Sequence, residues 1–277
     1  MTRETSPHTP PRNRGKKLLE VEQSVAASTP ANRTNTRLYR LASQLYQTAR
    51  TCWLEEDDTE SAEEMLLAAI ESCDRYTGQR REMPHMRIAA INMLTMLYHR
   101  LGRLADAERT MLLQLEAERA LAVKNGEVYT ENVAVTLWYM GNLYVEMHRD
   151  RDAEKAYLEA LELRSRFDDE DIYRYRPATA QCHRSLGNLY FSRLNNPDTA
   201  ERHYRAAVSI SEELCEDEYE RCNHIRGLAM SLRLLAAFYE ESGRKELAQP
   251  IAERAAALEA EFEIPLPFDM PADSEES

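Results

Sequence analysis

The sequence predicts an all-α fold, a solenoid of about five antiparallel helix pairs, and three observations lead to it. Only 8 of the 277 residues are glycine, and runs that alternate apolar and polar residues are scarce, which argues against β-strands. Ala, Leu, Glu and Arg dominate, and apolar residues recur at three- and four-residue steps, as in amphipathic helices. A small residue recurs with separations of 45, 46, 47 and 48 residues at Ala62, Ala107, Ala153, Ala200 and Ala248. A period of about 46 residues with two helices in each period indicates a repeat protein.

Composition divides the chain into three parts. Residues 1–36 are rich in Pro, Ser, Thr, Asn and Arg, so we expect a basic arm without stable structure. The solenoid is expected over residues 37–260, and an acidic, disordered tail over residues 261–277. In the first pair, Asp58 is expected to cap the second helix and Gly78 to end it in the left-handed conformation.

The later units also contain expected helix boundaries. The third pair contains AVTLWYMGNLYVEMHRDRDAEKAYLEA, with Thr130 as the expected N-cap of its first helix. The acidic stretch FDDEDIYRYRP, which ends at Pro177, is expected to break its second helix. In the fourth pair, Asn196 is expected to cap a helix that begins at Pro197. Pro250 is expected to kink or delay the last helix, because an interior proline costs ~3 kcal/mol.

The charge distribution excludes some classes of partner. The net charge is -13, and residues 1–40 carry eight basic and three acidic residues, so the remaining chain is strongly acidic. An acidic body argues against nucleic-acid binding, which needs clustered Lys and Arg. No apolar run approaches the ~20 residues that span a bilayer, and no secretory signal is visible. Five scattered cysteines without a CxxC pair fit a reducing compartment, so we expect a soluble, cytoplasmic protein without membrane contact.

The order Leu-Gly-x-x-Tyr, then Ala, Tyr and Ala, recurs within the units. The clearest copies are Met140-Gly141-Asn142-Leu143-Tyr144 with Ala153, Tyr157 and Ala160, and Leu186-Gly187-Asn188-Leu189-Tyr190 with Ala200, Tyr204 and Ala207. This order resembles the tetratricopeptide repeat, and the long period is similar to the subgroup that includes kinesin light chain repeats. The resemblance covers about residues 38–260. It implies a right-handed superhelical solenoid whose first helices line a concave, peptide-binding groove.

Candidate binding residues are those that the repeat pattern leaves on the outward side of the first helices. They are Asn92, His99, Trp138, Asn142, Gln181, Arg184, Asn188, Phe191 and Arg233. Asparagine amides can pair with a peptide backbone, arginine can bind a ligand carboxylate, and aromatic side chains supply apolar contact area. Alternatively, Asn142 and Asn188 merely cap solvent-facing helix surface.

The sequence gives little support to catalysis. It contains no Gly-rich phosphate loop, no Gly-x-Ser-x-Gly and no His-Glu-x-x-His motif, so we expect no enzyme activity, no cofactor and no metal. Cys182 and His183 are adjacent, so on a helix their side chains point about 100° apart. Cys215, Cys222 and His224 form only a weak metal-binding pattern.

The function we expect is a non-catalytic protein–protein interaction module that binds a peptide or a partner protein in the groove. One alternative is a homo-oligomeric scaffold, in which Trp138, Phe191 and Phe268 supply self-association surface. Another is a regulatory subunit of a larger complex, in which the basic arm and the acidic tail make the contacts.

Overall fold

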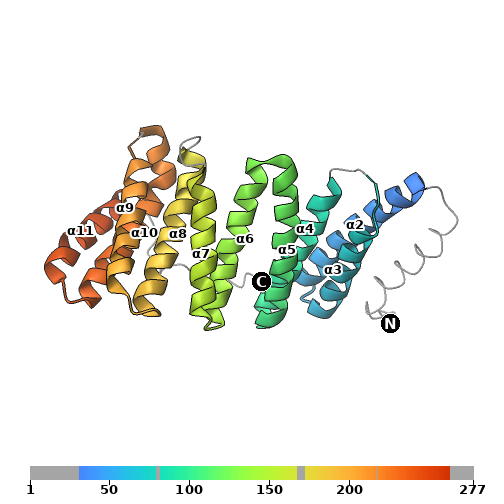
Figure 1. The fold of residues 1–277 in the computed structure, drawn as a ribbon, viewed down its shortest axis with the longest axis horizontal. Helices are drawn as coiled ribbons and strands as arrows, with labels where there is room; N and C mark the ends of the chain where they lie inside the picture. The colour runs from blue at the N-terminus through green and yellow to red at the C-terminus, as the bar shows by residue number, and fades with distance from the viewer. Residues whose placement is uncertain (1–30, 79–81, 167–171, 217, 263–277) are drawn as a thin grey trace, which may run out of the picture. The chain divides into compact units, whose positions relative to one another are not determined.

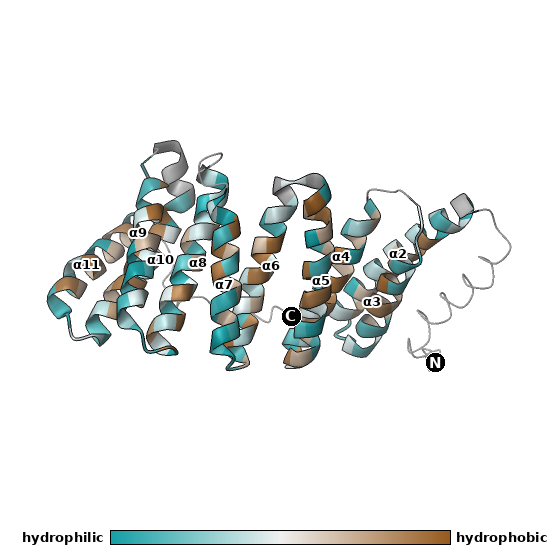
Figure 2. Ribbon diagram, in the orientation of Figure 1, coloured by the Kyte–Doolittle hydropathy of each residue, from teal (hydrophilic) through white to brown (hydrophobic). Residues whose placement is uncertain are grey.

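The computed structural model describes residues 31–78, 82–166, 172–216 and 218–262, which form ten α-helices and no strand. The chain divides into two compact units, Met1–Gly126 and Glu127–Ser277. The predicted all-α fold of five antiparallel helix pairs is confirmed (Figure 1). In Figure 2 each helix carries both hydrophobic and hydrophilic residues, as amphipathic packing requires.

Unit 1 holds two helix pairs. Its helices are α2 (Ala31–Leu54), α3 (Thr59–Asp74), α4 (Glu82–Arg100) and α5 (Leu104–Asn125). α2 packs on α3 and α4 packs on α5, and α3 also packs on α4, so the second helix of one pair contacts the first helix of the next.

Unit 2 holds three pairs arranged by the same rule. Its helices are α6 (Glu127–Glu146), α7 (Asp150–Ser165), α8 (Ile172–Ser192), α9 (Pro197–Glu213), α10 (Glu218–Glu241) and α11 (Lys245–Glu261). Each pair packs internally, and the junctions between pairs are formed by α7 with α8 and by α9 with α10.

Close approach of the two helices explains the small residues of the repeat. A Cβ atom on Gly141 would lie 2.3 Å from Cε1 of Tyr157, and one on Gly187 would lie 2.7 Å from Cδ1 of Tyr204. Both tyrosine rings are buried and cannot move aside. Glycine is therefore required here by space and not by backbone conformation.

In the second pair, different residues occupy the position where the two helices approach closely. Thr95 stands at the position of Gly141, and its hydroxyl donates to Oγ1 of Thr110 on α5 at 2.8 Å. Met111 stands where the third and fourth pairs have tyrosine. Both hydroxyls are buried and hydrogen-bonded, so the polar pair carries no unsatisfied group.

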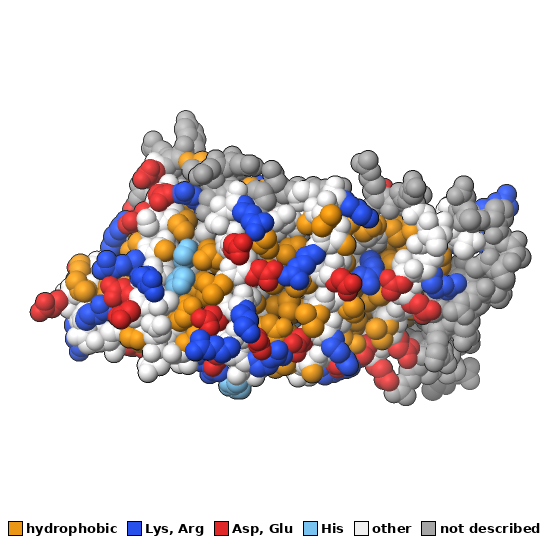
Figure 3. All heavy atoms as spheres, in the orientation of Figure 1, with side chains coloured by type: hydrophobic (Ala, Val, Ile, Leu, Met, Phe, Trp, Pro, Cys, Tyr) orange, Lys and Arg blue, Asp and Glu red, His pale blue; other side chains and the backbone are white. Residues whose placement is uncertain are grey.

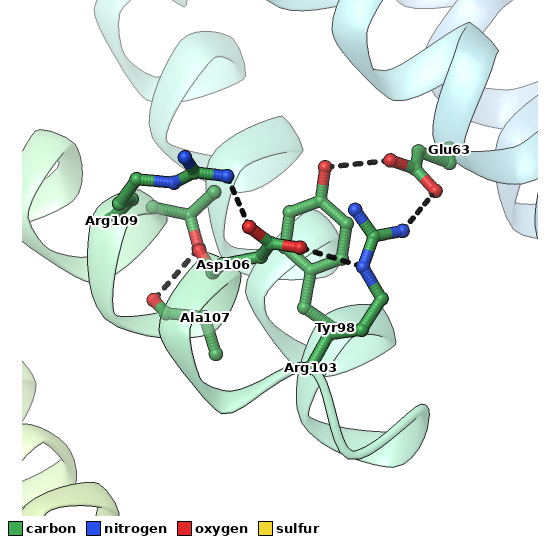
Figure 4. A network of polar contacts seen from close by, with 7 residues as sticks. Glu63, Tyr98, Arg103, Asp106, Ala107 and Arg109 are labelled. Carbon is green, nitrogen blue, oxygen red and sulfur yellow. Dashed lines mark hydrogen bonds and ion pairs between the residues drawn. The ribbon is translucent and has the colours of Figure 1, made fainter.

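A tyrosine, a glutamate and an arginine connect consecutive pairs, as Figure 4 shows for unit 1. The Tyr98 hydroxyl on α4 donates to Oε1 of Glu63 on α3 at 2.9 Å. Arg103 donates to Oε2 of the same carboxylate at 2.7 Å, and its guanidinium lies 4.3 Å from the Tyr98 ring centroid. Asp106 accepts from Arg103 at 2.7 Å, which fixes the arginine from the other side. One carboxylate thus holds the next helix pair through two donors.

The same arrangement recurs in unit 2. Tyr239 donates to Glu201 at 2.8 Å, Arg244 donates to the other oxygen of Glu201 at 2.7 Å, and Arg244 stacks on the Tyr239 ring at 4.6 Å. Tyr190 likewise donates to Glu154 at 2.6 Å. The glutamate always follows the aligned alanine of the second helix directly, so the connection is part of the repeat.

Two of the predicted helix caps are confirmed. The side chain of Asp58 accepts from the backbone N–H of Ser61 at 3.0 Å at the start of α3. The side chain of Asn196 accepts from the N–H of Thr199 at 3.2 Å, and Pro197 is the first residue of α9. Each cap satisfies a backbone donor that the first turn leaves open.

The prediction for Gly78 is wrong. α3 ends at Asp74, and its C-cap residue Arg75 has right-handed backbone angles, φ -77° and ψ -11°. The N–H of Arg75 bonds to the carbonyls of Glu71 and Cys73, so the helix terminates before the chain reaches the glycine.

Three further boundaries differ from the sequence pattern. α6 begins at Glu127, so Thr130 lies inside the helix and is not its cap. α7 ends at Ser165, just before the acidic stretch as predicted, but Pro177 lies inside α8 and does not break a helix. α11 begins at Lys245, so Pro250 does not delay its start. Each proline is the sixth residue of its helix, so it removes one hydrogen bond to a first-turn carbonyl and leaves the rest of the helix intact.

The boundary expected at residue 37 also differs. α2 begins at Ala31, and within its first turns Oδ1 of Asn35 accepts from the N–H of Thr77 at 3.2 Å. The remainder of the predicted arm, the acidic stretch before α8 and nearly all of the predicted tail lie outside the described residues.

Glycine-to-alanine substitutions test the close approach within a pair. We expect Gly141→Ala to lower the free energy of unfolding by about 1–3 kcal/mol, because the new Cβ overlaps the buried Tyr157 ring. Gly227→Ala in α10 is the matched control. Nothing lies within 4 Å of a Cβ there, so we expect a gain of about 0.5–1 kcal/mol. Urea denaturation followed by circular dichroism measures both; equal stability of the two variants would contradict the contact.

Candidate functional site

The nine predicted binding residues all lie on first helices. They are Asn92 and His99 on α4, Trp138 and Asn142 on α6, Gln181, Arg184, Asn188 and Phe191 on α8, and Arg233 on α10. The last seven belong to unit 2, and the candidate site is therefore the surface of α6, α8 and α10 that carries them. We call this surface the first-helix face of unit 2.

The two residues of unit 1 lie on one exposed side of α4. Asn92 and His99 are exposed, and the exposed Met96 lies between them one turn from each. Their binding role stays a prediction.

Trp138 connects two first helices. Its indole N–H donates to Oγ of Ser185 on α8 at 2.9 Å, and the indole is half-buried. Its neighbour Tyr139 packs edge-on against it at 5.0 Å and is 53% exposed. The more accessible aromatic of this helix is therefore Tyr139, which the repeat pattern gave no reason to select.

Asn142 and Asn188 are hydrogen-bonded within their own pairs. Oδ1 of Asn142 accepts from the Tyr157 hydroxyl at 2.6 Å, and Oδ1 of Asn188 accepts from the Tyr204 hydroxyl at 2.7 Å. Each amide oxygen is thus engaged by the second helix, and the NH₂ group remains for a ligand. Their role in binding stays a prediction that depends on the amide nitrogen.

The two predicted arginines have different environments. Arg233 donates from Nε to Oε1 of Glu259 at 2.8 Å and from Nη2 to Oε2, a bidentate ion pair with a buried carboxylate of α11. Arg184 is half-buried and donates from Nη1 to the hydroxyl of Ser231 at 3.1 Å. No carboxylate in the described ranges forms an ion pair with Arg184, and burial lowers the pKa of its guanidinium. Only Arg184 has its positive charge left for a ligand.

Phe191 and Gln181 complete α8. Phe191 is half-buried and packs edge-on against the buried Phe238 of α10 at 5.0 Å, so much of its ring contributes to the junction of two pairs. Gln181 is half-buried and lies three residues before Arg184, which places both on one side of the helix.

A buried charge network lies beneath this face and was not predicted. The side chain of Arg164 on α7 is 2% exposed. It forms an ion pair with Glu131 at 3.3 Å and donates to the Ala178 carbonyl at 3.1 Å, and its Nη1 lies 2.9 Å from Sγ of Cys182. Burial raises the pKa of the Glu131 carboxyl. The signal in the sequence is a charged residue at a position where helical spacing places the core.

Cys182 and His183 diverge as predicted. Cys182 is buried beside the Arg164 guanidinium, whereas Nδ1 of His183 lies 2.9 Å from Nδ1 of His203 on α9. His203 in turn stacks on the Tyr190 ring at 5.4 Å. Within the described ranges no group of three or more His, Cys, Asp or Glu side chains is placed to hold a metal ion.

Acidic and basic side chains are interleaved over the face shown in Figure 3, in keeping with the many ion pairs along the repeats. No helix in the described part of the chain is long and apolar enough to cross a membrane.

Known proteins share the repeated helix pairs of this chain. Residues 132–213, within unit 2, match the tetratricopeptide repeat family model. The predicted resemblance to the tetratricopeptide repeat is thus confirmed over this segment, which holds the clearest copies of the recurring Gly, Tyr and Ala positions. No curated protein sequence matches the chain.

Several solved structures share the fold. BtubC (BKLC) from P. vanneervenii is 23% identical, with 91% of each chain covered and a TM-score of 0.62. A putative kinesin light chain from Podosopora anserina with TPR-like repeats is 16% identical over 80% of this chain and 95% of that one, with a TM-score of 0.58. The MamA protein is 16% identical over 83% and 98%, with a TM-score of 0.51. Likeness at this identity shows the fold alone.

The histidine pair makes stability depend on pH. Burial, His183 and Arg202 lower the pKa of His203 from 6.5 to about 4, and burial lowers that of His183. Because the unfolded chain binds these protons more readily, the contribution to stability is complete above about pH 6.5 and is lost as pH falls towards 4.

We therefore expect His203→Gln to reduce the loss of stability between pH 7 and pH 5, measured as the urea midpoint at each pH. His85→Gln is the control, because His85 is exposed. An unchanged pH dependence in His203→Gln would contradict the assignment.

Proposed function

We propose that the chain is a non-catalytic interaction module and that the first-helix face of unit 2 binds an extended segment of a partner protein. The observation that carries this proposal is the half-buried side chain of Arg184, whose guanidinium makes one hydrogen bond among the described residues, to the Ser231 hydroxyl, and no ion pair. A desolvated charge without a counter-ion is costly, and a carboxylate of the ligand would supply charge-assisted hydrogen bonds.

The surroundings of Arg184 support a peptide ligand. Asn142 and Asn188 stand at equivalent positions 46 residues apart and keep their amide N–H groups for an acceptor. Tyr139 and Met230, which are 53% and 40% exposed, offer apolar contact area on α6 and α10. Arg233 is not part of the proposal, because Glu259 already occupies its guanidinium.

A self-associating scaffold is the second candidate, and one observation favours it. Leu67, Leu112 and Leu158 each follow the aligned alanine of their second helix by five residues. They are 48%, 46% and 40% exposed, which is unusual for leucine at a repeated position. This scaffold would use second helices and leave the first-helix face free.

We also propose a cytoplasmic location, because Cys52, Cys73 and Cys182 are buried thiols outside any disulfide.

Substitution of Arg184 tests the peptide-binding proposal. Panning of a random-peptide phage library on the full chain would supply the probe, and we expect the selected peptides to contain Asp or Glu. We expect Arg184→Gln to weaken their binding about tenfold or more, in line with the loss of a charge-assisted pair. The melting temperature should change little, because Arg184 contributes no internal ion pair.

Arg202→Gln is the matched control, since Arg202 is an exposed arginine on the second helix α9 whose side chain donates to the nearby Thr199 hydroxyl. Equal binding by Arg184→Gln and the wild type would exclude the proposed site. Sedimentation of the full chain over a range of concentrations, with Leu158→Arg for comparison, distinguishes the scaffold candidate.

A further inference from the structure

We propose that the hydroxyl groups of Tyr157 and Tyr204 act as positioning groups for the ligand. They hold the amides of Asn142 and Asn188 with the oxygen turned inward, so that each asparagine offers only N–H donors. A bound segment would then be held through its backbone carbonyl oxygens. This inference rests on the proposed function, because it concerns the same first-helix face.

The position of each hydroxyl is fixed by packing. The rings of Tyr157 and Tyr204 are buried on the second helices and lie against Gly141 and Gly187, where a single added Cβ would overlap them. Tyr204 also packs on Phe238 with 5.4 Å between ring centroids. A ring held in this way can place its oxygen at one point only, 2.6–2.7 Å from the amide oxygen.

The protonation of the tyrosines fixes the direction of the hydrogen bonds. Burial raises the pKa of both phenols well above the usual value, so both keep their proton at neutral pH. The phenol proton must then go to an acceptor, and in an asparagine side chain only the oxygen accepts. The NH₂ group is left on the other side of the amide.

In the third pair a second donor lies near this hydrogen bond. The Trp138 indole can only donate, and it donates to Ser185 at 2.9 Å. It therefore does not use the oxygen of Asn142, which accepts from Tyr157.

The sequence of the chain itself links the two residues. Asparagine follows the glycine position in the third and fourth pairs, and these are the pairs whose second helix carries the tyrosine. In the second pair the corresponding residues are Met96 and Met111, and in the fifth they are Ala237 and Ala252. An asparagine that only capped solvent-facing helix surface would not need a tyrosine partner on the second helix. The two tyrosine–asparagine pairs therefore share one arrangement, with their amides on α6 and α8 of unit 2.

The consequence for the ligand is chemical and specific. Two donor-only amides cannot distinguish one side chain from another, but they can each bind a carbonyl oxygen, which every residue of an extended segment presents. Side-chain preference is then left to Arg184 and to the apolar residues nearby. Tyr157 and Tyr204 touch no ligand themselves.

The test uses the full chain with Tyr157→Phe and Tyr204→Phe combined, and a phage-selected peptide as the probe. Phenylalanine keeps the ring packing and removes the hydroxyl. We expect the affinity for the peptide to fall about five- to tenfold, since two oriented hydrogen bonds are weakened. The side-chain NH₂ signals of Asn142 and Asn188 in ¹⁵N NMR spectra should also show greater mobility.

The matched control combines Tyr190→Phe and Tyr239→Phe. These hydroxyls bond to Glu154 and Glu201 at junctions, so their loss should reduce stability and leave peptide affinity unchanged. Tyr204→Phe alone provides a milder variant if the double variant unfolds. Unchanged affinity and unchanged NH₂ signals would overturn the inference, even where Arg184→Gln still weakens binding. If Arg184→Gln binds the peptide as tightly as the wild type does, the proposed function itself is overturned.

Discussion

The close approach of the two helices in a pair is the constraint on which the other features depend. At Gly141 and Gly187 the first helix has no side chain, and the tyrosine of the second helix fills the space against its backbone. The same tyrosine then reaches across to the asparagine beside the glycine. Packing density thus determines where the hydroxyl lies, and the hydroxyl determines how the amide is turned.

Connections between pairs use a different principle. Within each unit a carboxylate on a second helix receives a tyrosine hydroxyl and an arginine from the next pair, as Glu63 and Glu201 do. These groups lie near the surface, where a single ion pair contributes little, but a shared carboxylate fixes two donors in one geometry. The third and fourth pairs thus depend on a close contact at glycine, and the junctions add a directional polar contact to their packing.

On the first-helix face of unit 2, contacts within the protein determine which side chains remain open to a ligand. Of the two arginines on α8 and α10, Arg233 has a buried carboxylate partner and Arg184 has a hydroxyl. Trp138 and Phe191 are half-buried, because each bonds or packs across to the next first helix. The residues still open to a ligand are fewer than the outward positions of the helices, since a repeat array also uses those positions to stack.

Sequence alone determined the all-α class, the five pairs, the period and the caps at Asp58 and Asn196, because these follow from local spacing and local hydrogen bonding. It also placed the candidate residues on first helices. Only the tertiary structure decided which outward residues were engaged, because the partners Glu259 and Ser231 lie 26 and 47 residues away on other helices. It also shows α2 beginning at Ala31, with Asn35 in a contact to a residue 42 positions away. Ser231 does not recur at the equivalent position of the other units, so the repeat pattern does not predict it as the partner of Arg184.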